Sequence, residues 1–288
     1  MAPVRILAPA KVNLFLHVGP VGADGYHPLS SLVAFADIGD SVTVEAAGRL
    51  SLTVTGPFAK GLDDAGDNLI FNALRALGQV AGGGEPPLAA ALDKQLPIAA
   101  GLGGGSSDAG AALKAARDLL DLALDDDALA GIAAAVGADG PMCLHARAAW
   151  AEGRGDRLTF EPRLPPLPAL LINPGVPSPT GAVYRAYDEA GAGGADRPDP
   201  PANWTAGSVI RWLADQRNDL EGPAVSLQPA IAAALSEARR LPGVRLVRMS
   251  GSGATVFALF DTAEQAAQAA GRLTKVRPDW WVRAATLR

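Results

Sequence analysis

The segment from Pro97 to Ser107 has the composition of a loop that binds phosphate. Positions 101, 103, 104 and 105 are glycines, and two serines follow them directly. Glycine adopts positive φ angles at little cost and lets a backbone come close to a ligand. An alanine-rich helical pattern begins after the serines, and the first turn of a helix offers unpaired N–H groups and a positive dipole end. Together these features predict a seat for phosphate.

Two common phosphate loops are excluded by the order of these residues. The Walker A pattern needs a lysine after its second glycine, and none follows Gly105. The dinucleotide pattern needs a glycine at the position of Ser106. A flexible glycine linker is the remaining alternative. A strand-like apolar run before the loop and a well-patterned helix after it argue against a linker.

Lys11 and Asp139 are candidate catalytic residues, although each has a simpler interpretation. Lys11 lies in the apolar segment 8–16, where a buried cation needs a partner. The alternative is a lysine at a strand edge that extends its ammonium group into water. Asp139 lies in the turn 137–141, where it could serve only as a turn residue.

Composition limits the class of protein. A chain of 288 residues with 49% hydrophobic and 19% charged residues is typical of a globular protein with two domains. The net charge of −5 and the pI of about 5.2 argue against a nucleic-acid or anionic-membrane partner. Cys143 is the single cysteine, so we expect a buried core thiol and no disulfide. No apolar run is long enough to span a bilayer, and the first residues do not resemble a signal peptide. We therefore expect a cytoplasmic protein.

The first part of the chain is expected to be rich in strands and then in helices. Strands are expected at Val12–Val18 and at residues 41–45 and 50–54, the latter two joined as a hairpin through residues 47–49. Asn68 precedes a helical pattern, and a strand is expected near residues 88–92. Two further helices are expected after Ser106 and over residues 125–136. The second should stop at the glycines and proline of residues 137–141.

A proline-rich segment, residues 162–168, predicts the approach to a second domain, which divides the chain into residues 1–162 and 163–288. Beyond it, strands and helices alternate in the order βαββαβ, which is typical of a ferredoxin-like unit. The expected elements are residues 169–172, 227–241, 244–249, 255–260, 263–273 and 281–286. Residues 191–203 are expected to form a mobile surface loop.

Four motifs occur in an order that resembles the GHMP kinases, the superfamily of galactokinase and of homoserine, mevalonate and phosphomevalonate kinases. They are Pro-Ala-Lys-x-Asn-Leu-x-Leu at residues 9–16, the glycine loop, Gly-Ala-Asp-x-Pro at 137–141 and Gly-Ser-Gly-Ala at 251–254. The resemblance implies an α+β fold with two domains. The N-terminal domain would be like ribosomal protein S5 domain 2 and the C-terminal domain ferredoxin-like.

The resemblance also assigns ATP and Mg²⁺ to the chain. Lys11 and Asp139 would be catalytic, with Asp139 accepting a hydroxyl proton and Lys11 keeping it ionised. Mg²⁺ would lie near Ser106 or Ser107. Asp67-Asn68-Leu69 resembles the adenine-side segment of the family, although Asn68 could equally cap a helix and Lys94 could be a solvated charge. The ATP-binding residues would be Asn68, Lys94, Pro97, Gly101, Leu102, Gly103, Gly104, Gly105, Ser106 and Ser107.

A further motif, Asp-Gly-Tyr-His-Pro-Leu at residues 24–29, resembles the branch of these kinases that acts on 4-diphosphocytidyl-2-C-methyl-D-erythritol. Tyrosine offers a stacking face for a pyrimidine, and histidine offers nitrogens that match a cytosine edge. The branch implies ATP-dependent phosphorylation of the tertiary 2-position hydroxyl of that substrate, in the non-mevalonate (methylerythritol phosphate) pathway to isoprenoid precursors. Its substrate residues would be Asn13, Tyr26, His27, Thr180, Tyr184, Gly251, Ser252 and Gly253.

Two alternatives remain open. The chain could be another small-molecule GHMP kinase, of the homoserine or mevalonate type. It could also be a non-catalytic binding protein on the same fold, because a fold does not fix a function. In each case we expect a monomer or a homodimer that binds a small molecule.

Overall fold

The computed structural model describes residues 2–62, 68–191 and 193–288. These residues divide into two units, and neither is a continuous stretch of chain. The first unit draws on residues 1–10, 38–98 and 103–146, and the second on residues 11–37, 99–102 and 147–288. The continuous division at residues 162 and 163 stays a prediction.

Strands β1 (Val4–Val18) and β2 (Leu29–Ala46) pair with each other and contribute to both units. In the first unit, β4 (Leu88–Asp93) lies between β2 and β3 (Ser51–Thr55). It is antiparallel to β2 and parallel to β3. The hairpin expected from residues 41–45 and 50–54 is therefore wrong. A short connection between two alternating runs looks like a hairpin locally, but a distant strand takes the place between them.

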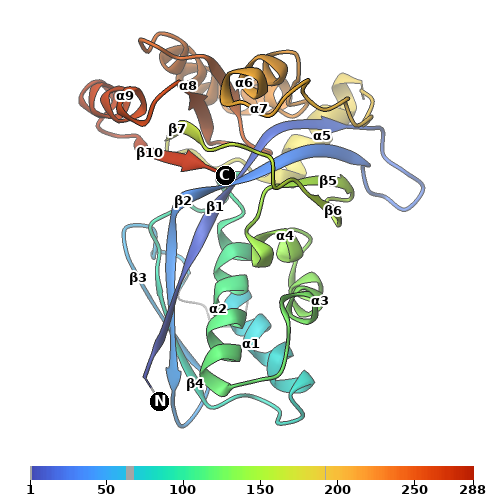
Figure 1. Ribbon diagram of the computed structural model, residues 1–288, viewed down its shortest axis with the longest axis vertical. Helices are drawn as coiled ribbons and strands as arrows, with labels where there is room; N and C mark the ends of the chain where they lie inside the picture. The colour runs from blue at the N-terminus through green and yellow to red at the C-terminus, as the bar shows by residue number, and fades with distance from the viewer. Residues whose placement is uncertain (1, 63–67, 192) are drawn as a thin grey trace. The chain divides into compact units, whose positions relative to one another are not determined.

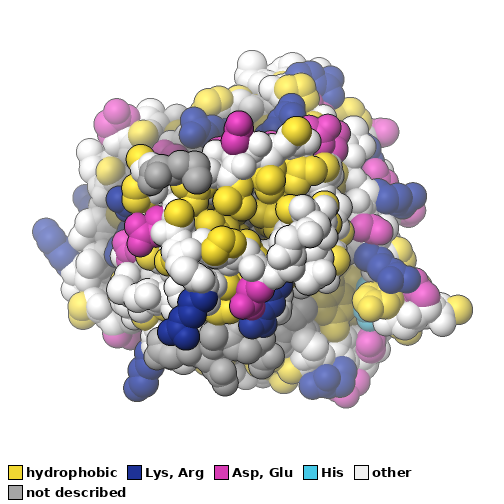
Figure 2. Space-filling view, turned by 90° about the horizontal axis from the view of Figure 1, so that it is seen from below, with side chains coloured by type: hydrophobic (Ala, Val, Ile, Leu, Met, Phe, Trp, Pro, Cys, Tyr) yellow, Lys and Arg dark blue, Asp and Glu magenta, His cyan; other side chains and the backbone are white. Residues whose placement is uncertain are grey.

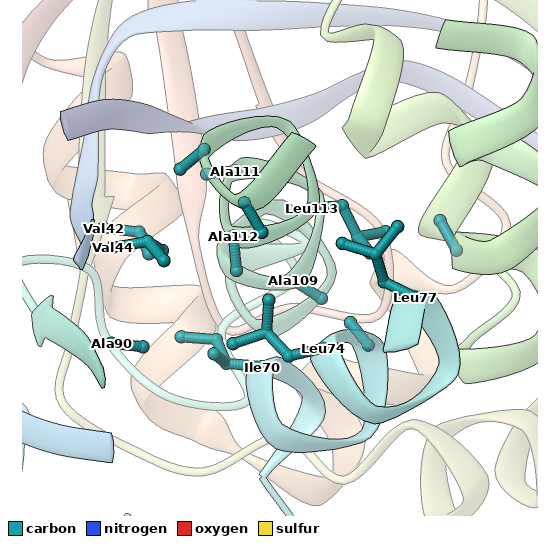
Figure 3. Close-up of a cluster of buried hydrophobic side chains, with 14 of the residues drawn as sticks. Val42, Val44, Ile70, Leu74, Leu77, Ala90, Ala109, Ala111, Ala112 and Leu113 are labelled. Atoms are coloured by element: carbon teal, nitrogen blue, oxygen red, sulfur yellow. The ribbon is translucent and has the colours of Figure 1, made fainter. Parts of the chain in front are cut away.

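Helices α1 (Leu69–Val80) and α2 (Gly104–Leu120) pack side by side over the sheet of the first unit. Figure 3 shows their apolar side chains facing those of β2 and β4, among them Ile70, Leu74, Val42, Val44 and Ala90. The small residues of α2 suit this contact, because short side chains let a helix approach a neighbour closely. The predicted helices and strand of this unit are confirmed.

Two helices complete the first unit, α3 (Asp126–Val136) and α4 (Gly140–His145). The sequence predicted α3 and its end at residues 137–141, and both are confirmed. It did not predict α4, which begins within that segment. Pro141 lies in the first turn of α4, where its missing N–H group is harmless. Gly140 is needed there, because a Cβ atom would collide with the carbonyl oxygen of Ala133.

The second unit contains a four-stranded antiparallel sheet in the order β10-β7-β9-β8. These strands are β7 (Leu167–Asn173), β8 (Leu246–Met249), β9 (Val256–Leu259) and β10 (Trp281–Leu287). Figure 1 shows β7 and β10 next to each other. Helices α8 (Pro229–Arg239) and α9 (Ala263–Val276) pack against it. This order of strands and helices confirms the ferredoxin-like unit. Strands β5 (Ala149–Gly153) and β6 (Arg157–Phe160) extend the first half of β2.

Three helices of the second unit lie between β7 and α8, where no helix was expected. They are α5 (Thr180–Ala190), α6 (Ala206–Ala214) and α7 (Glu221–Leu227). Residues 191 and 193–203 contain no helix or strand, and backbone oxygens of Asp196 and Asp199 contact His17 and Trp212. Whether this loop moves stays a prediction. No helix in the described part of the chain is long and apolar enough to cross a bilayer.

Charged side chains of both signs are mixed on one face of the molecule (Figure 2). On the face shown in Figure 2, lysine and arginine side chains are interspersed with aspartate and glutamate rather than gathered by sign. An anionic ligand would therefore need a local site of N–H donors or buried cations.

Candidate active site

The first part of the glycine loop is fixed by three successive carbonyl groups, all within the second unit. Thr255 N donates to Ala100 O at 3.1 Å, Ser250 Oγ to Gly101 O at 2.9 Å, and Lys11 N to Leu102 O at 2.8 Å. Gly101 has φ +72°, and a Cβ atom there would collide with the carbonyl oxygen of Ser250. The loop therefore lies directly against the strand that carries Lys11.

The second part of the loop, in the first unit, leads into helix α2. Gly103, with φ +61°, occupies the N-cap position and provides no side-chain cap. The N–H groups of the first turn therefore have no acceptor within the helix. The hydroxyl of Ser107 is buried without a hydrogen-bond partner. These donors and this oxygen fit a nucleotide polyphosphate and its Mg²⁺ ion.

Lys94 is buried under the start of α2 in an ion-pair cluster. Its Nζ lies 2.5 Å from Asp40 Oδ2 and 2.7 Å from Asp108 Oδ2. The interpretation of Lys94 as a solvated charge is therefore wrong. A Cβ atom on Gly104 would lie 3.1 Å from the Lys94 Nζ, so glycine makes room for the ammonium group.

For both Lys94 and Asp108, burial shifts the pKa in one direction and the oppositely charged neighbour shifts it in the other. Burial raises the pKa of Asp108 to about 7 against the opposing effect of Lys94. Burial lowers the pKa of Lys94, but Asp108 and Asp40 together raise it above its usual value. Asp40 also accepts from the N–H groups of Gln95 and Leu96 through Oδ1. The cluster thus connects β2, the end of β4 and the phosphate-loop helix.

Lys11 is buried as well, with 6% of the residue exposed, so the alternative of an ammonium group in water is wrong. Its Nζ donates to Asn13 Oδ1 at 2.9 Å. The two residues are two positions apart on β1, which places both side chains on one face of the strand. Asn13 thus provides a polar partner for the buried ammonium group.

Asp139 precedes α4, at its N-cap position, in the first unit. Lys11 belongs to the second unit, and the pairing of these two residues stays a prediction. In the first unit, a Cβ atom on Gly137 would lie 3.7 Å from Ser106 Oγ. The turn that leads to Asp139 therefore lies close to the start of the phosphate-loop helix.

The loop between β8 and β9 joins the substrate-side residues of the second unit. Gly251 has φ +56°, and its Cβ position is 3.3 Å from Asn13 Oδ1. Ser252 Oγ lies 2.9 Å from Thr180 Oγ1, at the start of α5. Gly253 has φ +85°, a backbone conformation that favours glycine. The loop is both a hairpin turn and a neighbour of Asn13 and Thr180.

Histidine and tyrosine rings gather beside α5. The His27 ring lies 5.0 Å from that of Tyr184, and its Nδ1 is 2.9 Å from Gly19 O. Its Nε2 lies 3.3 Å from Asp188 Oδ1. Tyr26 is exposed, and Arg154 covers one face of its ring at 4.0 Å. The predicted pyrimidine-binding residues thus lie on the segment 24–29 and on helix α5.

The remaining predicted residues lie in the first unit. Asn68 caps α1 and accepts from Ile70 N, which confirms the capping interpretation. Pro97 is buried at the start of the loop. Asp67 lies outside the described residues. Within those residues no group of three or more histidine, cysteine or acidic side chains could hold a metal ion.

Sequence reasoning missed four polar residues of the site: Asp40, Asp108, Ser31 and Ser250. Asp108 directly follows the loop serines, and Ser250 precedes the late glycine motif, so their positions carried a signal. Asp40 and Ser31 belong to no motif, so nothing in the sequence indicated their role.

The fold and the loop define the class of protein. The chain matches the family model "GHMP kinases N terminal domain" over residues 68–147 and the model "GHMP kinases C terminal" over residues 205–279. The two-domain α+β fold expected from the sequence is therefore that of the GHMP kinases.

Individual relatives define the branch. The 4-diphosphocytidyl-2-C-methyl-D-erythritol kinase of Caulobacter vibrioides is 56% identical over 280 residues, which cover 96% of both chains. The protein of that name from Dinoroseobacter shibae is 47% identical over 290 residues, covering 99% of this chain and 96% of the relative. A crystal structure titled 4-(cytidine 5'-diphospho)-2C-methyl-D-erythritol kinase matches with a TM-score of 0.79 and 36% identity, covering 99% of both chains. The chain belongs to the family of 4-diphosphocytidyl-2-C-methyl-D-erythritol kinases.

Proposed function

We propose that this protein transfers the γ-phosphoryl group of ATP to the tertiary 2-position hydroxyl of 4-diphosphocytidyl-2-C-methyl-D-erythritol. This step belongs to the non-mevalonate pathway to isoprenoid precursors, and we propose that it takes place in the cytoplasm. The main structural support for this proposal is the hydrogen bond from Lys11 N to Leu102 O, because it joins the strand that carries Lys11 to the glycine loop. Phosphoryl transfer depends mainly on such positioning of donor, acceptor and charge.

The ATP side of the site would consist of the loop and its supports. The N–H groups of Gly101, Gly103, Gly104 and Gly105 and of the serines would hold the phosphates. Leu102 would contribute through the backbone, and Pro97 would shape the start of the loop. Asn68 would lie on the adenine side. Lys94 would stabilise the phosphate region from its buried position beside Gly104.

Mg²⁺, when bound, would neutralise part of the charge on the phosphates. Ser106 and Ser107 are the residues that would hold it. The buried hydroxyl of Ser107 supports this role, because it has no protein partner.

Asp139 would accept the proton of the attacking hydroxyl as a general base. Lys11 would keep this carboxylate ionised and would stabilise the negative charge that develops during transfer. The burial of Lys11 supports such a role, because an ammonium group in an apolar setting exerts a strong local field.

On the substrate side, Tyr26 and Tyr184 would stack against the cytosine ring, and His27 would bond its edge. Thr180 would bond the cytidyl group, and the loop of Gly251, Ser252 and Gly253 would face the diphosphate. Asn13 would contact the polyol. The contact of Ser252 with Thr180 supports a common role for these two segments.

An assay of ADP release tests the proposal directly. With Mg-ATP present, 4-diphosphocytidyl-2-C-methyl-D-erythritol should produce ADP, whereas homoserine and mevalonate should not. ADP release with homoserine or mevalonate instead would indicate a GHMP kinase that acts on a smaller alcohol. Absence of substrate-dependent ADP with all three would favour a binding protein.

A further inference from the structure

We propose that two buried serines are positioning residues of the site: Ser31 orients the amide of Asn13 and thereby holds the ammonium group of Lys11, and Ser250 ties the same strand to Gly101 of the phosphate loop. The inference rests on the proposed catalytic role of Lys11. All of the residues involved belong to the second unit. They form one buried hydrogen-bonded chain that runs from β2 through β1 to the loops at residues 101 and 250.

The central residue of this chain is Asn13, whose amide can face its neighbours in only one way. Lys11 Nζ has only donors, so the group that faces it at 2.9 Å must be the carbonyl oxygen Oδ1. The amide nitrogen Nδ2 then points to Ser31 Oγ, 2.8 Å away on β2. The side chain is 6% exposed, so water offers little alternative to these partners.

Ser31 selects this orientation. Its hydroxyl donates its single proton to the carbonyl oxygen of Phe15 at 2.5 Å. It can therefore only accept from Asn13, which requires the NH₂ group of the amide on that side. A hydroxyl committed in this way fixes the amide, and the amide fixes the place of the Lys11 ammonium group.

Ser250 provides the second anchor. Its hydroxyl accepts from Asn13 N at 3.1 Å and donates to Gly101 O at 2.9 Å. The residue is fully buried. One side chain thus ties the backbone of the lysine strand to the first glycine of the loop. Ser250 should therefore act on the loop, whereas Ser31 should act on Lys11.

Removal of the Ser31 hydroxyl should disturb this arrangement without unfolding the protein. In Ser31→Ala the amide of Asn13 loses the acceptor of its Nδ2, and only the bond from Lys11 Nζ still orients it. The amide can then tilt from the position that Ser31 gave it, and the ammonium group bonded to its Oδ1 moves with it. The ammonium group would then leave its place, and a displacement of about 1 Å in an active site can cost about 10²-fold in rate.

The chain contains a matched control in the neighbouring residue, Ser30. It is as fully buried as Ser31, but its hydroxyl has no hydrogen-bond partner. Ser30→Ala therefore removes the same atom at the same depth without breaking any bond. Steady-state kinetics of wild type, Ser30→Ala and Ser31→Ala should be compared well below the melting temperature of each protein, with circular dichroism to check folding.

We expect Ser31→Ala to lower kcat by at least about tenfold with KM values for both substrates within about twofold of wild type. Ser30→Ala should match wild type in all of these constants. Ser250→Ala should raise KM for ATP, because the Gly101 carbonyl loses its donor. A loss of packing alone would lower the melting temperature without this division between kcat and KM.

A folded Ser31→Ala protein with wild-type kcat, or with the same change as Ser30→Ala, would overturn the role of Ser31. An unchanged KM for ATP in Ser250→Ala would overturn the role of Ser250. These outcomes differ from a failure of the proposed function, in which the wild-type protein itself would release no ADP with the cytidylyl substrate.

Discussion

Burial decides the interpretation of the lysines at the scale of single residues. Lys11 and Lys94 are each almost fully buried, and each has polar partners that stabilise its charge. A buried ammonium group destabilises the folded state unless it is paired. Lys11 contacts the glycine loop through its backbone, and Lys94 lies beside Gly104. Lys11 donates to the amide oxygen of Asn13, and Lys94 pairs with the carboxylates of Asp40 and Asp108. The two carboxylates hold Lys94 in place under the start of α2, which suits a supporting role.

The proposed acid–base chemistry predicts the effect of Asp139→Asn. The amide has nearly the shape of the carboxylate but cannot accept the hydroxyl proton, so kcat should fall by about 10²–10⁴-fold. Lys11→Ala should cause a loss of similar size. ADP release by purified variants, with circular dichroism to check folding, measures both effects. Asp118→Asn, which changes an exposed aspartate on α2, is the control.

Near-normal turnover in folded Asp139→Asn would contradict its role as the base. Retained turnover in Lys11→Ala would reduce Lys11 to a packing residue.

His17 makes stability depend on pH. Burial lowers the pKa of its imidazole below the usual 6.5, against the opposing effect of its contact with the Asp196 carbonyl. Its Nε2 is buried without a partner. The unfolded chain therefore binds a proton at this residue before the folded protein does. The resulting stability is present above about pH 6.5 and is lost as pH falls below that value.

His17→Phe removes the titrating group and keeps an aromatic ring beside Phe15. The melting temperature of wild type minus that of the variant should therefore decrease between pH 7.5 and pH 5.5, because only wild type has His17 to protonate in the unfolded state. Differential scanning calorimetry in matched buffers measures this difference. A difference that stays constant over the range would show that His17 titrates alike in the folded and unfolded chains, and one that grows as pH falls would show that folding raises its pKa.

At the scale of elements, the contact between α2 and α4 positions the start of α4 and with it Asp139. Gly110 on α2 faces α4 at close range, because a Cβ atom there would lie 2.9 Å from Leu144 Cα. In Gly110→Ala the two helices must move apart. Alanine normally stabilises a helix interior by up to about 1 kcal/mol over glycine, but here the close backbone contact should reverse the sign. We expect a lower melting temperature and a lower kcat.

Gly131 on α3 provides the matched control, because a Cβ atom there would meet nothing within 4 Å. Gly131→Ala should raise the free energy of unfolding by about 0.5–1 kcal/mol and leave kcat unchanged. Chemical denaturation and ADP release measure the two effects. If Gly110→Ala proved as stable and active as Gly131→Ala, the contact between α2 and α4 would not constrain the site.

The elements that the sequence predicted well are those with a clear local period. The stripe of Leu69, Ile70, Ala73 and Leu74 predicted α1, and the strands and helices α8 and α9 of the ferredoxin-like unit were also found. Helix α4 was missed because its Gly-Pro start also signals a stop. Helices α5 and α7 were missed because each buries few apolar residues. Helix α6 was missed although Val209, Ile210 and Leu213 form an apolar stripe at helical spacing. The false hairpin arose because strand partners are set by contacts distant in sequence.

Residues of the candidate site that belong to a motif could be predicted from the sequence, and those outside any motif could not. The glycine loop, Lys11, Asp139 and the late glycine motif could be found because their order along the chain resembles one family. Asp40 and Ser31 could not, since each acts through a partner that is distant in sequence and has no motif of its own. Their importance appears only when burial and hydrogen bonds are known.

At the scale of the whole molecule, the two units do not correspond to two continuous stretches of chain. The chain passes from one unit to the other within β1, within β2 and on either side of residues 99–102. The crossings within β1 and β2 do not interrupt the strands, so no shift in composition marks them. The proline-rich segment 162–168 is the clearest local signal, and it lies within the second unit. A domain boundary predicted from composition therefore divides the chain once, whereas the contacts divide it at several points.

The net charge of −5 bears on how the molecule selects its ligands. General electrostatic attraction does not favour anions here, so binding must depend on local donors and stacking surfaces. Cytidine 5'-diphosphate carries the base and the diphosphate of the proposed substrate and should bind without ATP. At about 100 times Kd it should stabilise the folded state by about 2.7 kcal/mol, which corresponds to a rise of several degrees in melting temperature.

A thermal-shift series measures this effect and includes its own controls. Homoserine and mevalonate at equal concentration should leave the melting temperature unchanged, and uridine 5'-diphosphate should shift it less, because the N3 atom of uracil is a donor where that of cytosine is an acceptor. Tyr184→Ala should reduce the shift by cytidine 5'-diphosphate through loss of a stacking face. Equal shifts by the cytidine and uridine diphosphates would indicate recognition of the diphosphate alone. A shift by mevalonate or homoserine would instead favour a smaller alcohol as the substrate.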